Sequence, residues 1–294
     1  MSVEAVRARL PDGRWHFQHG PIDLIILAEG ESETVEHSHE LAWRRFRNLL
    51  HELVQELPLL RAPVSDGPCP VQGPVARRMW WACAPLREEF ITPMAAVAGA
   101  VADTVADFYR RHGVRRAAIN NGGDIALVLA PGEPMRIGIV ADAYRGKNAP
   151  AGEVFIQRGA PGTALVGGVA TSGWRGRSQS LGIADAVTVL AASAAEADAA
   201  ATLIANAVNV THRLIERRPA NQIKDDTDLG ERLVTVKVPT LPRSTVAQAL
   251  RGGARRARYW LAQERIAGAA LLCQGQARII GSGIRAIPPI MASP

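Results

Sequence analysis

The sequence contains few cysteines and no long apolar run, and each absence excludes a class of protein. Its three cysteines, Cys69, Cys83 and Cys273, are odd in number and scattered, which favours neither a disulfide framework nor a cysteine zinc site. No run of roughly 18 apolar residues occurs, as a transmembrane helix requires. The N-terminal stretch MSVEAVRARLPDGRW lacks the apolar core of a signal peptide. We therefore expect a cytoplasmic protein that does not insert into membranes.

The composition is that of a folded protein with a substantial core. Of 294 residues, 47% are hydrophobic and 21% are charged, which is ordinary for globular chains. The formal net charge of +6 favours anionic ligands without specifying one. We expect a single domain over residues 1–294.

Hydrophobic periodicity predicts helices and strands that alternate along the chain. Helices are predicted over about 34–57, 93–111, 194–217 and 245–266. Residues 58–88 are rich in proline and are predicted to be irregular. Strands are predicted at 14–20, 22–30, 117–120, 125–130, 136–141, 153–157, 164–173, 186–191 and 233–238, with a hairpin at 269–280. Because several strands follow one another through short connections, we expect an α/β (α+β) fold with a largely antiparallel sheet.

The segment INNGGDIAL, residues 119–127, places two glycines between two apolar runs. Glycine adopts positive φ without steric cost and allows a ligand or another backbone to approach closely. Asn121, Gly122, Gly123 and Asp124 are therefore interpreted either as a tight hairpin turn or as a binding loop.

Two later segments carry candidate ligand groups. Thr171, Ser172 and Gly173 end a predicted strand, where hydroxyls and backbone groups can face a ligand. Asp198 and Thr202 are four residues apart on a predicted helix, so their oxygens share one helical face, separated only by alanines. Hard oxygen ligands of this kind suit Mg²⁺. The alternative is that Asp198 complements the helix dipole and Thr202 fills space.

Two further motifs favour ordinary structural roles. His37 and His39 lie two apart in a predicted helix, so they point to different sides and do not share a metal. The arginine-rich segment 251–258, followed by Tyr259 and Trp260, resembles a nucleic-acid footprint, but no nucleic-acid fold motif accompanies it. We interpret it as a solvated helix face.

The order of these motifs resembles the ApbE-type flavin transferases, which transfer FMN from FAD to a threonine or serine of a target protein with Mg²⁺. The resemblance covers roughly residues 90–210: G-G-D after a strand, then A-T-S-G, then V-T-V and A-D-x-x-x-T on a helix. It implies an ApbE-like fold with residues 121–124 and 171–173 in a flavin-nucleotide pocket. It also implies that the backbone of Ala170 lies near the metal and that Asp198 and Thr202 are Mg²⁺ ligands.

The segment between A-T-S-G and V-T-V departs from those enzymes. It is short, and it lacks their histidine-containing H-I-x-D-P motif. Asp185 is its sole carboxylate and becomes the candidate catalytic base, while Arg175 and Arg177 are candidate phosphate partners. The chain therefore resembles the shorter, cytoplasmic ApbE-like group, in which the fold is expected to carry over more surely than the reaction.

Three functions are compatible with these residues. The first is an ApbE-like protein that binds a flavin nucleotide with Mg²⁺ and transfers FMN to a protein hydroxyl. The second is an enzyme on the same fold that acts on a carboxylate or phosphate substrate without flavin. The third is a non-catalytic ligand-binding or nucleic-acid-associated protein. The oligomeric state and the acceptor are left open by the sequence.

Overall fold

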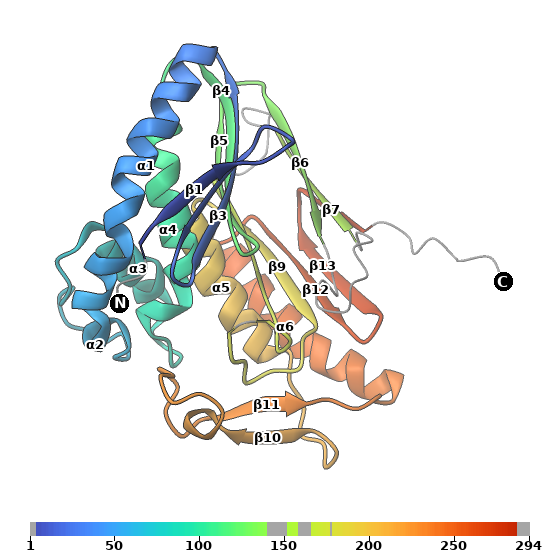
Figure 1. Cartoon of the computed structure of the whole chain (residues 1–294). Coiled ribbons are helices and arrows are strands. Elements are labelled where there is room, and N and C mark those ends of the chain that lie inside the picture. The colour runs from blue at the N-terminus through green and yellow to red at the C-terminus, as the bar shows by residue number, and fades with distance from the viewer. Residues whose placement is uncertain (1–3, 140–151, 158–165, 177, 287–294) are drawn as a thin grey trace. The chain divides into compact units, whose positions relative to one another are not determined.

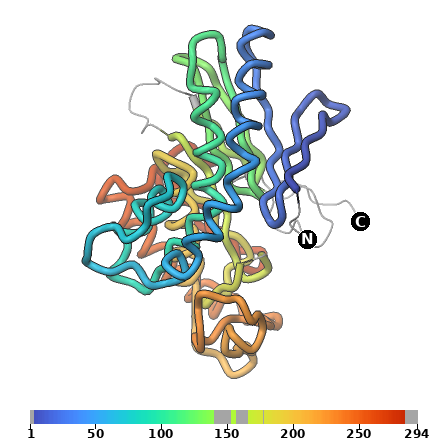
Figure 2. Tube along the Cα trace, turned by 60° about the vertical axis from the view of Figure 1, so that its left-hand side comes forward, coloured from blue at the N-terminus to red at the C-terminus, as the bar shows by residue number. Residues whose placement is uncertain are grey.

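The protein is a mixed α/β chain with a large, mainly antiparallel sheet, which confirms the predicted fold class. The structure, a computed structural model, describes residues 4–139, 152–157, 166–176 and 178–286 (Figure 1; Figure 2). The chain divides into two compact units. The first comprises Met1–Glu133, Leu165–Ala170 and Leu190–Ala200, and the second comprises Pro134–Ala164, Thr171–Val189 and Ala201–Pro294. The single domain over residues 1–294 stays a prediction.

The first unit is built on antiparallel neighbours in the order β1-β2-β3-β4-β5-β8. Their bounds are β1 Val6–Arg9, β2 Trp15–His19, β3 Ile22–Gly30, β4 Val114–Asn121, β5 Asp124–Leu129 and β8 Gly168–Ser172. Alternate residues of β3, from Ile22 to Ile26, are buried, as a sheet with one face on a core requires. Helix α1, Ser32–Gln55, packs on this face through Phe46, whose ring centroid lies 5.4 Å from that of Phe17.

The helices of the first unit differ in part from the predicted ones. Helix α1 agrees closely with the predicted span 34–57. The segment 58–88, predicted to be irregular, contains α2 Leu57–Leu60 and α3 Pro74–Cys83. That prediction was wrong because Pro74 occupies the first turn of α3, where proline is tolerated. The predicted helix over 93–111 narrows to α4, Val97–Ala106, between 3₁₀ turns. Helices α1 and α4 lie side by side (Figure 1; Figure 2).

The second unit contains the remaining strands and two smaller sheets. Its pairings include the order β9-β12-β13, the two-stranded β10-β11 and the three-stranded β14-β7-β6. The bounds are β6 Pro134–Ile139, β7 Gly152–Gln157, β9 Ala186–Ala191, β10 Glu216–Pro219, β11 Leu233–Lys237, β12 Gly268–Cys273, β13 Gln276–Gly281 and β14 Ile284–Ala286. The β12–β13 hairpin confirms the one predicted at 269–280.

Helix α5, Ala194–Ala207, ends about ten residues before its predicted end. Just past the helix, the Val208 carbonyl accepts the Ile183 amide at 2.8 Å, and the Asn209 side-chain amide donates to the Leu181 carbonyl. These tertiary hydrogen bonds compete with helix propagation, which local propensity does not reveal. By the division above, β8, β9 and α5 each contribute residues to both units.

Helix α6, Arg243–Ala262, carries the arginine-rich segment. Arg251, Arg255 and Arg258 are exposed, whereas Ala254 and Trp260 are buried. This is the arrangement that the solvated-face interpretation predicts. Across the described ranges, no helix combines the length and the apolar character that crossing a membrane requires.

The two histidines of the H-x-H pair face different environments on α1, as predicted. His37 is exposed and His39 is buried, where its Nδ1 lies 2.7 Å from the Tyr109 hydroxyl. Burial lowers the pKa of His39 to about 4, with the positive charges of Arg9 and Arg7 acting in the same direction and Glu40 opposing them. The imidazole is therefore neutral in the folded protein near pH 7.

Stability is expected to fall as the pH decreases from 7 towards 4, partly through His39. The folded-state pKa lies below the unfolded value of about 6.5, so the unfolded chain binds more protons in this range. A His39→Gln variant should reduce the loss of unfolding free energy between pH 7 and pH 4.5 by about 2 kcal/mol. Urea unfolding at several pH values measures this. His37→Gln is the control and should keep the wild-type slope; equal slopes for His39→Gln and wild type would contradict the prediction.

Candidate functional site

The two glycines of the INNGGDIAL segment form the hairpin turn between β4 and β5. Gly122 and Gly123 have φ of 66° and 115°, and Asn121 pairs with Asp124 across the turn. The Asn120 side-chain oxygen accepts the Gly123 amide at 2.8 Å. Positive φ at both central positions of a two-residue turn matches the twist of a hairpin. The tight-turn interpretation is thus confirmed, and the binding role of residues 121–124 stays a prediction.

The space beside the turn is open. A Cβ built on Gly123 meets no atom within 4 Å. Asn121 and Asp124, in contrast, are buried, and the Asn121 Nδ2 donates to the Ala98 carbonyl at 3.1 Å. The turn therefore combines an accessible backbone with a buried polar pair below it.

The end of β8 lies at the same sheet end as this turn. Strands β5 and β8 run antiparallel with Ile125 opposite Val169, so the Asp124 end of β5 lies beside the Ala170 end of β8. Ala170 is buried. A backbone carbonyl from this stretch is a possible hard ligand, and the metal role of Ala170 stays a prediction.

Asp198 faces the start of α4. Its Oδ2 accepts the Gly99 amide at 3.1 Å. The two helices meet through backbone, since a Cβ on Gly99 would lie 2.2 Å from the Ala194 carbonyl oxygen. Thr202 lies one turn beyond Asp198 on α5 and is half-buried. Helical spacing places both side chains on one face, as predicted.

The electrostatic environment of Asp198 is unusual. Burial raises the pKa of its carboxyl well above the ordinary range, and the negative charges of Asp124 and Asp103 add to this effect. Hydrogen bonds from the Gly99 and Ala98 amides oppose it. Asp198 as a whole residue is partly exposed, whereas its carboxyl group is buried. Acidic groups placed this close repel one another, and an added cation relieves the repulsion.

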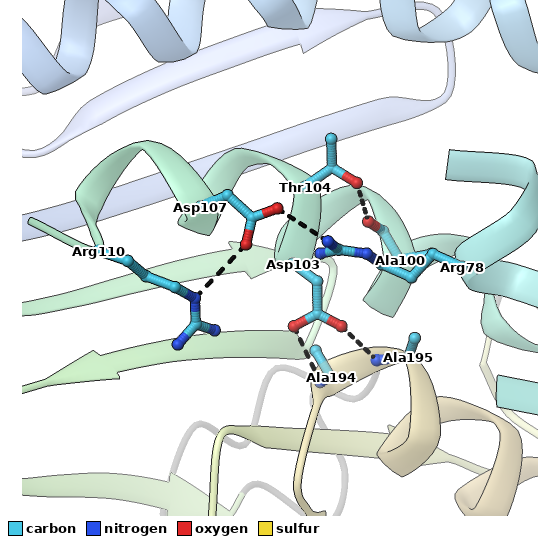
Figure 3. A network of polar contacts seen from close by, with 8 residues as sticks. All are labelled: Arg78, Ala100, Asp103, Thr104, Asp107, Arg110, Ala194 and Ala195. Carbon is cyan, nitrogen blue, oxygen red and sulfur yellow. Dashed lines mark hydrogen bonds and ion pairs between the residues drawn. The ribbon is translucent and has the colours of Figure 1, made fainter. Parts of the chain in front are cut away.

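A third carboxylate, Asp103 of α4, was missed by the sequence analysis. Its two oxygens accept the Ala194 and Ala195 amides at 3.1 and 2.9 Å (Figure 3). Asp103 is 2% exposed, and it lies 91 positions from Ala194 in the sequence. No local pattern signals a helix cap supplied from such a distance. A lone aspartate in an alanine-rich, apolar helix was the one available hint, because a buried charge needs partners.

The second unit holds the residues that follow Ala170. Thr171 is exposed, and its hydroxyl oxygen lies 2.8 Å from that of the buried Thr188. Ser172 is half-buried. Gly173 lies against backbone, since a Cβ there would be 2.5 Å from the Asp185 carbonyl oxygen. The cofactor-binding role of residues 171–173 stays a prediction.

Asp185 and Arg175 are engaged with each other. The Arg175 Nε lies 3.2 Å from Asp185 Oδ1, and Asp185 Oδ2 accepts a hydrogen bond from the backbone amide of Gln274 at 2.5 Å. The Arg175 guanidinium also lies over the Trp174 ring, 4.5 Å from its centroid. To act as a base or a phosphate partner, these groups must first exchange these contacts. Both assignments stay predictions, and Arg177 lies outside the described residues.

The order of the motifs in the sequence predicted an ApbE-like protein. The sequence model of the family described as "AbpE bacteria" matches residues 7–279. The chain belongs to this family. A UPF0280 protein of Methanosarcina barkeri is 34% identical over 203 residues, covering 68% of this chain and 75% of the relative. A UPF0280 protein of Methanosarcina acetivorans is 30% identical over 214 residues, covering 72% and 78%.

Two solved structures are similar to this chain over most of its length. The ApbE protein of Thermotoga maritima is 11% identical, with a TM-score of 0.46 and coverage of 95% of this chain and 97% of the other. The flavin transferase ApbE of Vibrio cholerae is 13% identical, with a TM-score of 0.41 and coverage of 95% and 97%.

Proposed function

We propose that this protein binds FAD together with Mg²⁺ near Asp124 and Asp198 and transfers FMN to a hydroxyl of a protein acceptor. The observation that carries the proposal is the buried Asp198 carboxyl, which accepts the Gly99 amide and whose pKa is raised by burial and by neighbouring acidic groups. Groups with strongly shifted pKa values concentrate at functional sites. Membership of the ApbE-like family and the order of the motifs support the same assignment.

The donor groups that we assign to Mg²⁺ are of the chemical kind that this ion prefers. Under this proposal Asp198 and Asp124 would supply carboxylate oxygens and Ala170 a carbonyl, all of them hard donors. The assignment of Thr202, one helical turn beyond Asp198, rests on its hydroxyl and its spacing alone. A bound Mg²⁺ would neutralise charge on the pyrophosphate and polarise it towards attack. The chain's own contribution would be to hold these oxygens on β5, β8 and α5.

The turn at Gly122 and Gly123 fits the approach of a nucleotide. With open space beside Gly123, a ligand can approach the backbone of the turn closely. Side chains at these two positions would strain the turn, because both φ values are positive. We assign residues 121–124 to contacts with the flavin nucleotide, and the family resemblance assigns the same role to residues 171–173.

For the transfer step we assign Asp185 as the base that accepts the proton of the acceptor hydroxyl. In the present structure Asp185 pairs with Arg175. A phosphate group can take over Arg175, because guanidinium groups bind phosphate through two hydrogen bonds. Binding of the nucleotide would then release the carboxylate for proton transfer.

Titration of purified protein with FAD, followed by flavin fluorescence, tests the binding step. Saturable binding is expected with Mg²⁺ and much weaker binding with EDTA, because the proposed ligands bind the nucleotide through the metal. Release of AMP from FAD on addition of a protein acceptor, with the mass of FMN appearing on that acceptor, tests the transfer. Absence of Mg²⁺-dependent FAD binding would overturn the proposal. Binding of simple phosphates or carboxylates without flavin would instead favour a small-molecule enzyme on this fold.

A further inference from the structure

The first turn of α5 has every backbone donor satisfied, by two separate devices. The first amides of a helix have no partner within the helix. Asp103 accepts the amides of Ala194 and Ala195. Ser193 Oγ accepts the Glu196 amide at 3.2 Å and donates to the Glu196 carboxylate at 3.0 Å. The local Ser193–Glu196 pair thus caps the Glu196 amide, and the distant Asp103 carboxylate caps the amides of Ala194 and Ala195.

The capping between α4 and α5 is reciprocal. Asp103 of α4 accepts amides at the start of α5, while Asp198 of α5 accepts the Gly99 amide at the start of α4. Ala194 and Asp198 lie four residues apart, or about 6 Å along the helix axis. A shift of the first turn of α5 therefore moves Asp198 relative to α4 by a similar amount.

Asp103 is itself held in place and surrounded by positive charge. Burial raises the pKa of its carboxyl, whereas the Ala195 and Ala194 amides and the charges of Arg78 and Arg110 lower it. These two arginines also pair with Asp107, at 2.8 and 3.4 Å (Figure 3). The carboxylate thus has two backbone donors and two nearby cations, which a buried charge requires.

We propose that Asp103 is a positioning residue: by capping α5, it fixes the location at which the Asp198 carboxylate meets the start of α4. The effect on ligand binding rests on the proposed function, because Asp198 is there a magnesium ligand. The effect on the hydrogen bond between Asp198 and the Gly99 amide rests only on the hydrogen bonds that Asp103 and Asp198 make in the structure. Asp103 contacts neither Asp198 nor the ligand in this proposal. It acts mainly through the helix, and its charge also acts on Asp198 at a distance.

Asp103→Asn is the direct test. One amide oxygen replaces two carboxylate oxygens, so Ala194 or Ala195 loses its acceptor while the side chain keeps its size. Amide hydrogen exchange should accelerate at these two residues, and the Gly99 amide resonance should shift as Asp198 moves. The Kd for FAD with Mg²⁺ should rise about 10- to 100-fold, as for other groups that orient metal ligands.

Asp107→Asn is the matched control, because Asp107 follows α4 and pairs with the same two arginines. It should leave the Gly99 resonance and the Kd at wild-type values. Asp103→Glu keeps the charge but moves it by one methylene, and it should give smaller changes of the same kind. It serves as the second variant if Asp103→Asn does not fold.

The outcomes separate the two levels of the argument. If exchange accelerates in α5 while the Gly99 resonance and the Kd stay unchanged, Asp103 has a purely structural role and the positioning proposal is overturned. If wild-type protein binds no FAD with Mg²⁺, the proposed function fails. The Gly99 resonance in Asp103→Asn then still decides whether Asp103 positions Asp198: a shift supports the proposal, and an unchanged resonance overturns it.

Discussion

An Asp198→Asn variant is expected to lose Mg²⁺-dependent FAD binding by at least roughly 100-fold while remaining folded. Removing a residue that only hydrogen-bonds to a metal ligand already lowers metal affinity by about 10- to 100-fold. Asp198 is proposed to contact the metal itself, so a larger loss is expected. The amide oxygen of asparagine carries no full charge and is a much weaker ligand for Mg²⁺. Calorimetric titration with FAD and Mg²⁺, at a temperature well below unfolding, measures the loss.

The same substitution should leave stability unchanged or raise it. The asparagine oxygen can still accept the Gly99 amide, and the repulsion from Asp124 and Asp103 disappears with the charge. A lower melting temperature together with lost binding would indicate that Asp198 is mainly a structural cap. Glu196→Gln, an exposed substitution on the same helix, should keep wild-type affinity, and wild-type affinity in Asp198→Asn would contradict its assignment as a ligand.

Features of the site that depend on local sequence could be predicted. Two adjacent glycines between apolar runs specify a two-residue hairpin, and both adopt positive φ. Glu196 follows Ser193 by three residues, the spacing of a capping box at a helix start, and the Ser193 hydroxyl accepts the Glu196 amide and donates to the Glu196 carboxylate. The four-residue spacing places Asp198 and Thr202 on one helical face. Each of these depends on residues within one or two turns of chain.

Features that depend on distant partners could not be predicted. The cap from Asp103 joins two helices far apart in sequence, and the end of α5 is set by hydrogen bonds to residues 181 and 183. The sequence indicated Asp185 as a candidate base and Arg175 as a candidate phosphate partner. It did not indicate that the two side chains form an ion pair with each other. Tertiary contacts override propensity and composition at such places.

Gly99→Ala is expected to destabilise the protein by about 2 kcal/mol or more, close to the upper range of overpacking effects. The added Cβ would lie 2.2 Å from the Ala194 carbonyl oxygen and 2.7 Å from the Ala195 nitrogen. Both are backbone atoms, so no side-chain rotation relieves the contact, and α4 must move away from α5. Chemical denaturation gives the change in unfolding free energy. Gly67→Ala, where the nearest atom is 3.7 Å from the new Cβ, is the control and should lie within about 1 kcal/mol of wild type.

The sign of the change in unfolding free energy shows whether the contact between α4 and α5 or the local helix propensity governs this position. Gly99 lies within α4, and alanine is favoured over glycine in a helix interior by about 1 kcal/mol. If propensity governed the position, Gly99→Ala would stabilise the protein, and the close approach of α4 and α5 would not hold in solution. Destabilisation, accompanied by weaker Mg²⁺-dependent FAD binding, is the result expected if this approach places the Asp198 carboxylate. The Gly99 amide is the donor to Asp198, so separating the helices removes that hydrogen bond as well.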